Sequence, residues 1–342
     1  MLKTLLDVWD AASERMLAAV ARRLARGITS EGWAVEKTRE TLAVRDELNA
    51  IMARLDLSAP ELVVKALGEA YGIGERAAAT MREATISTRP EVVQQLAVRL
   101  VTHLQGAHVP VVASHLDLYR RTVTAVELDM QTGTITRREA IARTVDRLLA
   151  AGVDRFPAAD GRAWHLDTYA RMAGRTIAAQ TAVQGQLDTM VADGRDLVII
   201  SDSARECENC RPWERSVLSI SGRSVGTVVD GRTVEHAVAD ARAGGLWHPN
   251  CTHRADPFTP GLTAKPAPVA NPDGYRAQQH LRALERQARE LKRRRTAAQQ
   301  IGDEATVRRV NASVREVGAR INAHTEASGL LRRRERERPV GA

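Results

Sequence analysis

All three cysteines of this 342-residue chain lie close together in the sequence, beside two histidines. Cys207 and Cys210 form one pair with two residues between them, and His248, Cys251 and His253 form a second group further along. Thiolates and imidazoles are ligands that zinc prefers, and four of them complete a tetrahedral site. The spacing therefore predicts a zinc site held by Cys207, Cys210 and Cys251 plus one of the two histidines.

Two other interpretations of these residues stay open. The cysteines could be reduced, buried thiols beside exposed histidines, or two of them could form a disulfide. Redox catalysis of the thioredoxin type is disfavoured, because no βαβ pattern surrounds Cys207 and Cys210. A metal is favoured over the alternatives, since a small unit without a large core commonly needs one for stability.

Other catalytic motifs are missing from the sequence. No glycine precedes any of the five lysines, which excludes a Walker A loop, and neither H-E-x-x-H nor G-x-S-x-G occurs. We therefore assign no catalytic residue and expect that the protein is not an enzyme.

The residues before the cysteines have the apolar spacing of helices. Aromatic residues make up only 3% of the chain, so its core must consist of alanine, leucine, valine and isoleucine. The pattern predicts a helical body over residues 1–194, which begins with a helical hairpin over residues 1–57 and a shorter helix from Ser58 to about Ala70. Further helices are expected near residues 74–86, 90–105, 109–130, 137–151 and 162–193.

The pattern changes at Gly194, where residues 196–200 form a β-branched run typical of a strand. Strands at residues 217–220, 225–229 and 232–234 are expected to form a meander, and residues 235–243 a short helix. The predicted divisions are a helical body (1–194), a small α+β Cys/His module (195–261), a proline-rich linker (262–274) and a basic helical arm (275–342). The predicted fold class is mainly α, with an elongated helical body, a zinc-knuckle-like module and a basic C-terminal arm.

The net charge of +8 is concentrated near the end of the chain. Residues 273–342 contain 17 basic and 9 acidic residues, which accounts for the whole excess. Dense guanidinium groups suit phosphate contacts with DNA. The candidate nucleic-acid-binding residues are Arg289, Lys292, Arg293, Arg294, Arg295, Arg332, Arg333 and Arg334. The alternative is a pair of helices joined by neighbouring charges, such as Glu285 with Arg289, or a helix that docks on an acidic protein.

The sequence predicts no transmembrane helix, because the longest uncharged stretch, residues 101–116, is interrupted by polar residues and a proline. Asp7 and Asp10 interrupt the apolar region that a signal peptide would need. We therefore expect synthesis and retention in the cytoplasm of the cell that makes it.

Three stretches together resemble a known family. Residues 207–214, with their Cys-x-x-Cys-Arg-Pro-Trp-Glu pattern, residues 219–222 (Ser-Ile-Ser-Gly) and residues 239–253, which end in His-Pro-Asn-Cys-Thr-His, are similar to phage minor capsid protein 2, related to the Mu F-like head morphogenesis proteins. Residues 161–172 and 196–201 upstream, and 275–279 downstream, extend the resemblance.

The resemblance implies a structural minor capsid protein of a tailed phage or prophage, made in the bacterial host cytoplasm and located in the virion. It would lie inside the head at the portal vertex and act in head morphogenesis, with a further part in DNA packaging or ejection. The implied partners are the portal protein, the major capsid protein and packaged double-stranded DNA. The apolar face of the first helix, which includes Trp9 and Met16, could dock on one of them or close the protein's own core.

The family often has a cysteine where this chain has His253, so the fourth zinc ligand stays open between His248 and His253. The alternative from another class is a zinc-dependent nuclease or other zinc-containing DNA-binding protein. Against a nuclease, both histidines lie inside the ligand motif, which leaves no clear general base.

Overall fold

The computed structural model describes residues 2–79, 89–130, 135–158, 161–264 and 270–338. The chain divides into two units, each assembled from three separate stretches. Unit 1 comprises residues 1–5, 60–101 and 171–278, and unit 2 comprises residues 6–59, 102–170 and 279–342. The division into consecutive domains at residues 194, 261 and 274 stays a prediction, and residues 265–269 of the expected linker lie outside the described residues.

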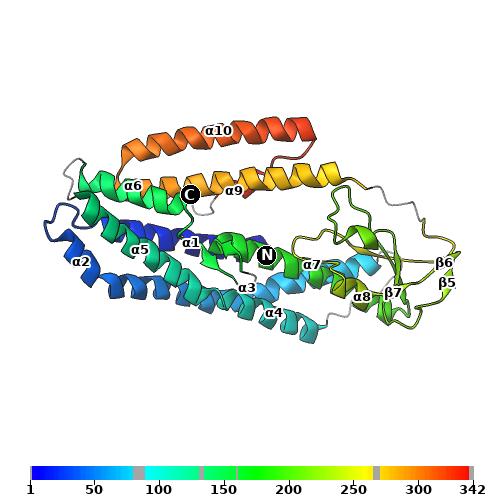
Figure 1. Cartoon of the computed structure of the whole chain (residues 1–342). Coiled ribbons are helices and arrows are strands. Elements are labelled where there is room, and N and C mark those ends of the chain that lie inside the picture. The colour runs from blue at the N-terminus through cyan, green and yellow to red at the C-terminus, as the bar shows by residue number, and fades with distance from the viewer. Residues whose placement is uncertain (1, 80–88, 131–134, 159–160, 265–269, 339–342) are drawn as a thin grey trace. The chain divides into compact units, whose positions relative to one another are not determined.

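The fold is mainly helical, as the sequence predicts (Figure 1). The α-helices among the described residues are α1 (Leu2–Ala25), α2 (Trp33–Arg39), α3 (Thr41–Ala79), α4 (Pro90–Gln105), α5 (His108–Met130), α6 (Arg137–Ala150), α7 (Leu166–Ala192), α8 (Val238–Ala243), α9 (Pro272–Ile301) and α10 (Glu304–Ser328). Two short 3-10 helices, η1 (Arg211–Trp213) and η2 (Arg334–Arg336), complete them. None of these helices is long and apolar enough to cross a membrane.

The early helix boundaries differ from the prediction. The helix expected to begin at Ser58 does not exist as a separate element, because α3 continues through Pro60 to Ala79. The Ser58 hydroxyl donates to the carbonyls of Arg54 and Leu55 within the helix and does not cap a new one. Residues 74–79 of the helix expected at 74–86 are the end of α3, and residues 80–86 lie outside the described residues.

The apolar face of α1 is covered by the chain itself. Trp9 is 2% exposed, and Leu5, Met16 and Val20 are also buried. The expectation that this face docks on another protein is therefore wrong, and its alternative, that the face closes the protein's own core, holds.

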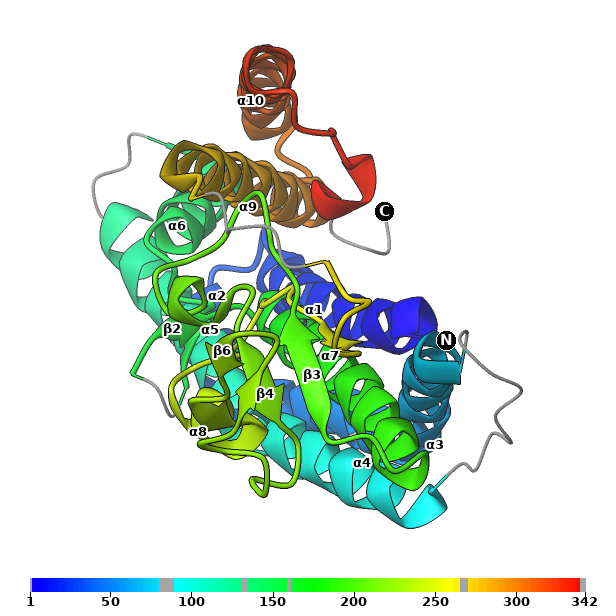
Figure 2. The same cartoon turned by 90° about the vertical axis from the view of Figure 1, so that its right-hand side faces the viewer.

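The main sheet has the strand order β7-β4-β3-β8. Its strands are β3 (Leu197–Ile200), β4 (Val217–Ser219), β7 (His236–Ala237) and β8 (Ala255–Pro257). The strand β3 lies beside β4 (Figure 2). It pairs antiparallel with β4 and β8, while β4 pairs parallel with β7. The predicted strand at 196–200 is confirmed.

The predicted meander holds in part: the strands expected at residues 225–229 and 232–234 pair with each other, but they do not join the sheet of the first strand. The strands β5 (Val228–Val229) and β6 (Arg232–Thr233) form a separate two-stranded sheet, and β8 occupies the edge beside β3. Another two-stranded sheet, β1 (Phe156–Pro157) with β2 (Ala163–Trp164), precedes α7. The strands that the sequence did not predict are β1, β2, β7 and β8, which contain two or three residues and are too short to show an alternating pattern.

Helices of unit 1 cover one face of the main sheet. Val183, Leu187 and Met190 of α7 pack in one apolar cluster with Val198 and Ile200 of β3. The opposite face of β3 packs through Ile199 in a second cluster with Val217, Val234 and Phe258. Because β3 is covered on both faces, its four residues are all apolar.

In unit 2, α9 and α10 run side by side (Figure 1). An apolar seam joins them and contains Leu281, Leu284, Ala288, Leu291, Val310, Val317 and Ile321. The Asp303 carboxylate begins α10 by accepting the backbone N–H groups of Ala305 and Thr306. This is a standard N-terminal cap, and Gly302 lies in the turn before it.

Within unit 1, α3 and α7 approach so closely that only glycine fits at two positions. A Cβ atom at Gly74 would lie 1.8 Å from the Ala182 carbonyl oxygen, and one at Gly185 would lie 2.4 Å from the Tyr71 carbonyl oxygen. The Tyr71 hydroxyl also donates to Asp188 over 2.7 Å. At Gly68, on the same helix, a Cβ atom would meet nothing within 4 Å.

Gly74 and Gly68, both on α3, make a matched pair for mutation. We expect Gly74→Ala to lower the free energy of unfolding by about 1–3 kcal/mol, because backbone atoms must move apart. We expect Gly68→Ala to raise it by about 0.5–1 kcal/mol, because alanine restricts the unfolded chain and favours a helix. Urea unfolding followed by circular dichroism measures both. Equal effects of the two substitutions would contradict the close α3–α7 contact.

Candidate metal centre

Two tight turns in unit 1 carry the predicted ligands. The backbone N–H of Cys210 donates to the Cys207 carbonyl over 3.1 Å, and that of Cys251 donates to the His248 carbonyl over 2.9 Å. The first turn follows β3 and leads into η1, and the second lies between α8 and β8. The two residues between the ends of each turn let both ends face the same point.

Packing of Trp247 fixes the second turn. This residue has a positive φ of 58° and is 5% exposed. Its indole N–H donates to the His253 carbonyl over 2.9 Å, and its own carbonyl accepts from Gln180 of α7 over 2.8 Å. Asn250 also has a positive φ, a conformation that asparagine tolerates better than most residues. The turn is therefore held from both sides before any ligand binds.

The structure brings the five predicted ligands into two groups that share only Cys210, and neither group contains all three cysteines. Two overlapping groups form, Cys207–Cys210–His248 and Cys210–Cys251–His253, and within each the ligand atoms lie within 4.8 Å of one another. Cys210 Sγ lies 3.5 Å from Cys251 Sγ, Cys251 Sγ 3.4 Å from His253 Nδ1, and Cys207 Sγ 2.9 Å from His248 Nε2. All three thiols are free of disulfides.

The donor set fits a metal of the zinc type. Zinc bound at about 2.3 Å from sulfur and about 2.0 Å from nitrogen places neighbouring ligand atoms about 3.5–3.8 Å apart in a tetrahedron. The Cys210–Cys251 and Cys251–His253 distances, 3.5 and 3.4 Å, are close to this range. Cys210 thus lies beside the later group, and these residues could hold a metal.

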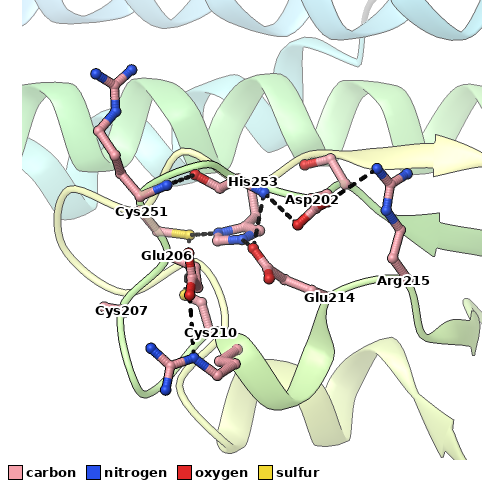
Figure 3. A network of polar contacts seen from close by, with 12 residues as sticks. Asp202, Glu206, Cys207, Cys210, Glu214, Arg215, Cys251 and His253 are labelled. Atoms are coloured by element: carbon pink, nitrogen blue, oxygen red, sulfur yellow. Dashed lines mark hydrogen bonds and ion pairs between the residues drawn. The ribbon is translucent and has the colours of Figure 1, made fainter. Parts of the chain in front are cut away.

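Two buried glutamates beside the cysteines were not identified from the sequence. Glu214 Oε1 lies 2.7 Å from His253 Nε2 and accepts the Ser203 backbone N–H over 2.9 Å. Glu206 accepts from Arg211 over 3.3 Å and from the Asn271 backbone N–H over 2.8 Å. Figure 3 shows the His253 ring between the Cys251 sulfur and the Glu214 carboxylate. Glutamates in a short loop are typical of an exposed surface, so only the fold reveals their burial.

Hydrogen bonds favour a charged sulfur at Cys251. The Cys210 thiol and His253 lower the pKa of Cys251 to about 4, against the opposing effect of burial. Burial acts to lower the pKa of His253, yet hydrogen bonds with Cys251 and Glu214 raise it above the ordinary value. The contact with Cys251 raises the pKa of Cys210. A thiolate is the form of cysteine that binds metals.

The eight basic residues predicted to contact DNA do not form one patch. Arg293 is 4% exposed and forms an ion pair with Asp167, and Arg294 donates to Asp146 over 2.6 Å. Lys292 donates to the Glu337 carbonyl over 2.7 Å, Arg332 pairs with the Glu337 carboxylate at 2.5 Å, and Arg289 donates to the Arg336 carbonyl.

The remaining three residues differ in exposure. Arg295 is half-buried, whereas the side chains of Arg333 and Arg334 are exposed. The contacts of Arg293 with Asp167 and of Arg294 with Asp146 hold α9 within unit 2. A charge count along the sequence missed this, because the acidic partners lie on α6 and α7. Glu285 forms an ion pair with Arg282 at 2.7 Å.

Comparison with known proteins agrees with this architecture. The family model for phage minor capsid protein 2 matches residues 1–326. Neither a curated protein nor a solved structure matches the chain. The family match includes the helices, the small sheet and both cysteine turns, and it covers most of the sequence. The chain therefore belongs to the phage minor capsid protein 2 family.

Proposed function

We propose that this protein is a structural component of the phage head, inside the head at the portal vertex, where it acts in head morphogenesis. The family match over residues 1–326 carries this proposal, since a minor capsid protein is a virion component. The portal protein and the major capsid protein are the proposed partners. No catalytic role is assigned to any residue.

Labelling of purified particles tests the proposed location. A tagged copy of the protein, bound by gold-labelled antibody in opened heads, is expected at a single vertex of each particle. A tagged major capsid protein is the control and should label the whole shell. Label at every vertex, or no protein in purified particles, would contradict the portal position.

We further propose that each chain binds one zinc ion through Cys207, Cys210, Cys251 and one histidine. When bound, zinc would supply a cross-link between the two cysteine turns. The supporting observations are the short distances between the donors and the buried hydrogen bonds around them. Small units commonly use such a metal in place of a larger core.

Metal analysis of the purified chain should find one zinc per molecule. We expect Cys210→Ser to abolish binding, because it removes the ligand common to both groups, whereas His280→Ala on α9 should retain it. Chelation should increase hydrogen exchange in β3, β4 and β8 and leave α10 protected. A zinc-free native protein, or three thiols that react at the rate of free cysteine in the folded state, would refute the metal centre.

A DNA contact is proposed for the exposed end of the basic segment. Arg333 and Arg334 are the predicted basic residues with exposed side chains, so they carry this proposal. Each phosphate neutralised contributes about −0.9 to the slope of log affinity against log salt. The alternative, a zinc-dependent nuclease, would instead cleave DNA when loaded with zinc.

The salt dependence of DNA binding tests this contact. Relative to the wild type, Arg333→Ala combined with Arg334→Ala should make the slope less negative by about 2. Arg121→Ala, at an exposed arginine of α5, is the matched control and should leave the slope unchanged. An unchanged slope in the double variant would exclude these two residues as phosphate contacts.

A further inference from the structure

We propose that His253, and not His248, is the fourth ligand of the metal centre, and that Glu214 is the positioning residue that holds its ring. This inference rests on the proposed zinc site and specifies how that site is built. It also gives a function to a buried carboxylate that the ligand motif does not include.

The His253 ring is already placed as a ligand. Its Nδ1 lies 3.4 Å from Cys251 Sγ, close to the separation of about 3.5 Å expected for two ligand atoms on one zinc ion. Its Nε2 faces Glu214 Oε1 at 2.7 Å, so Nδ1 is the ring nitrogen turned toward the sulfurs. The side chains of His253 and Glu214 are 3% and 0% exposed.

Glu214 is itself held in place. Its Oε1 accepts the Ser203 backbone N–H over 2.9 Å, and the backbone of Glu214 ends η1 by donating to the Arg211 carbonyl. The His253 carbonyl accepts the Trp247 indole N–H. A carboxylate bound to the distal nitrogen of a ligating histidine fixes the orientation of the ring and strengthens it as a ligand.

His248 is arranged differently. Its Nε2 lies 2.9 Å from Cys207 Sγ, which is shorter than the separation of about 3.5 Å expected for two ligands of one zinc ion, so the two atoms are in direct contact. Its Nδ1 contacts the carbonyl of Pro249, its own neighbour, at 2.8 Å. The ring is half-buried, and its two nitrogens contact a sulfur and a backbone carbonyl. We therefore assign His248 to a hydrogen bond with the Cys207 sulfur.

Cysteine substitutions identify the ligand directly. Zinc affinity is measured by competition with a chromophoric chelator, and cobalt is substituted to count thiolate ligands from the charge-transfer absorption. We expect His253→Cys to retain one metal and to raise the absorption from three thiolates to four. We expect His248→Cys to leave the count at three. The reverse result would overturn the assignment.

Glutamine substitutions test the positioning residue. We expect Glu214→Gln to lower zinc affinity about 10- to 100-fold while the stoichiometry stays at one. Glu206→Gln is the matched control, because Glu206 is equally buried and adjoins Cys207 but bonds to Arg211 and Asn271. It should change the affinity less than twofold. Equal losses in the two variants would show a structural effect of burial and refute the positioning role.

A double variant separates positioning from stability. Because Glu214 acts through the imidazole, Glu214→Gln should have no further effect on affinity in the His253→Cys chain. An undiminished loss there would overturn the inference. Wild-type protein that binds no metal would refute the metal centre and this inference together, whereas a metal-binding wild type with the reversed cysteine result refutes only the choice of ligand.

Discussion

The small sheet of unit 1 cannot by itself hold the two cysteine turns. Its strands contain four, three, two and three residues, so few backbone hydrogen bonds support the loops between them. What brings the turns together is the polar cluster in which Cys210, Cys251, His253 and Glu214 contact one another in sequence. The apolar side chains of α7 pack against the cysteines of this cluster, and Gln180 of α7 donates a hydrogen bond to the Trp247 carbonyl.

The charges of unit 2 show that a basic segment can be a structural element. Arg293 is buried with Asp167, and Arg293 and Arg289 hold the pKa of Asp167 well below its ordinary value although burial acts to raise it. Burial raises the pKa of the nearby Glu14 to about 7. The ion pairs of Asp167 therefore stabilise the fold at pH values above about 4, the pKa of an aspartate in the unfolded chain. Glu14 has the opposite dependence: its contribution to stability is complete below about pH 4 and is lost as the pH rises through about 7.

Local patterns in the sequence predict the helices and the ligand residues but not the partners of the ligands. The spacing of Cys207 and Cys210 indicates candidate metal ligands, and apolar periodicity predicts the helices α4, α5 and α6. Glu214 and Asp167 do not, because their roles depend on residues brought near by the fold. The prediction of a new helix at Ser58, based partly on Pro60, was wrong. The helix α3 continues through this proline and keeps Leu55, Ala59 and Val63 buried on one face.

If a metal ion joins Cys210 and Cys251 as proposed, it has a mechanical consequence for the residues between these two cysteines. The residues between these cysteines include β4, the β5–β6 hairpin and α8. With both sulfurs on one ion, tension applied at the two ends of the chain would pass across the ion and bypass that whole segment. The bypassed segment could not extend until a metal–sulfur bond broke. These elements would thus stay folded while other parts of the chain are under load.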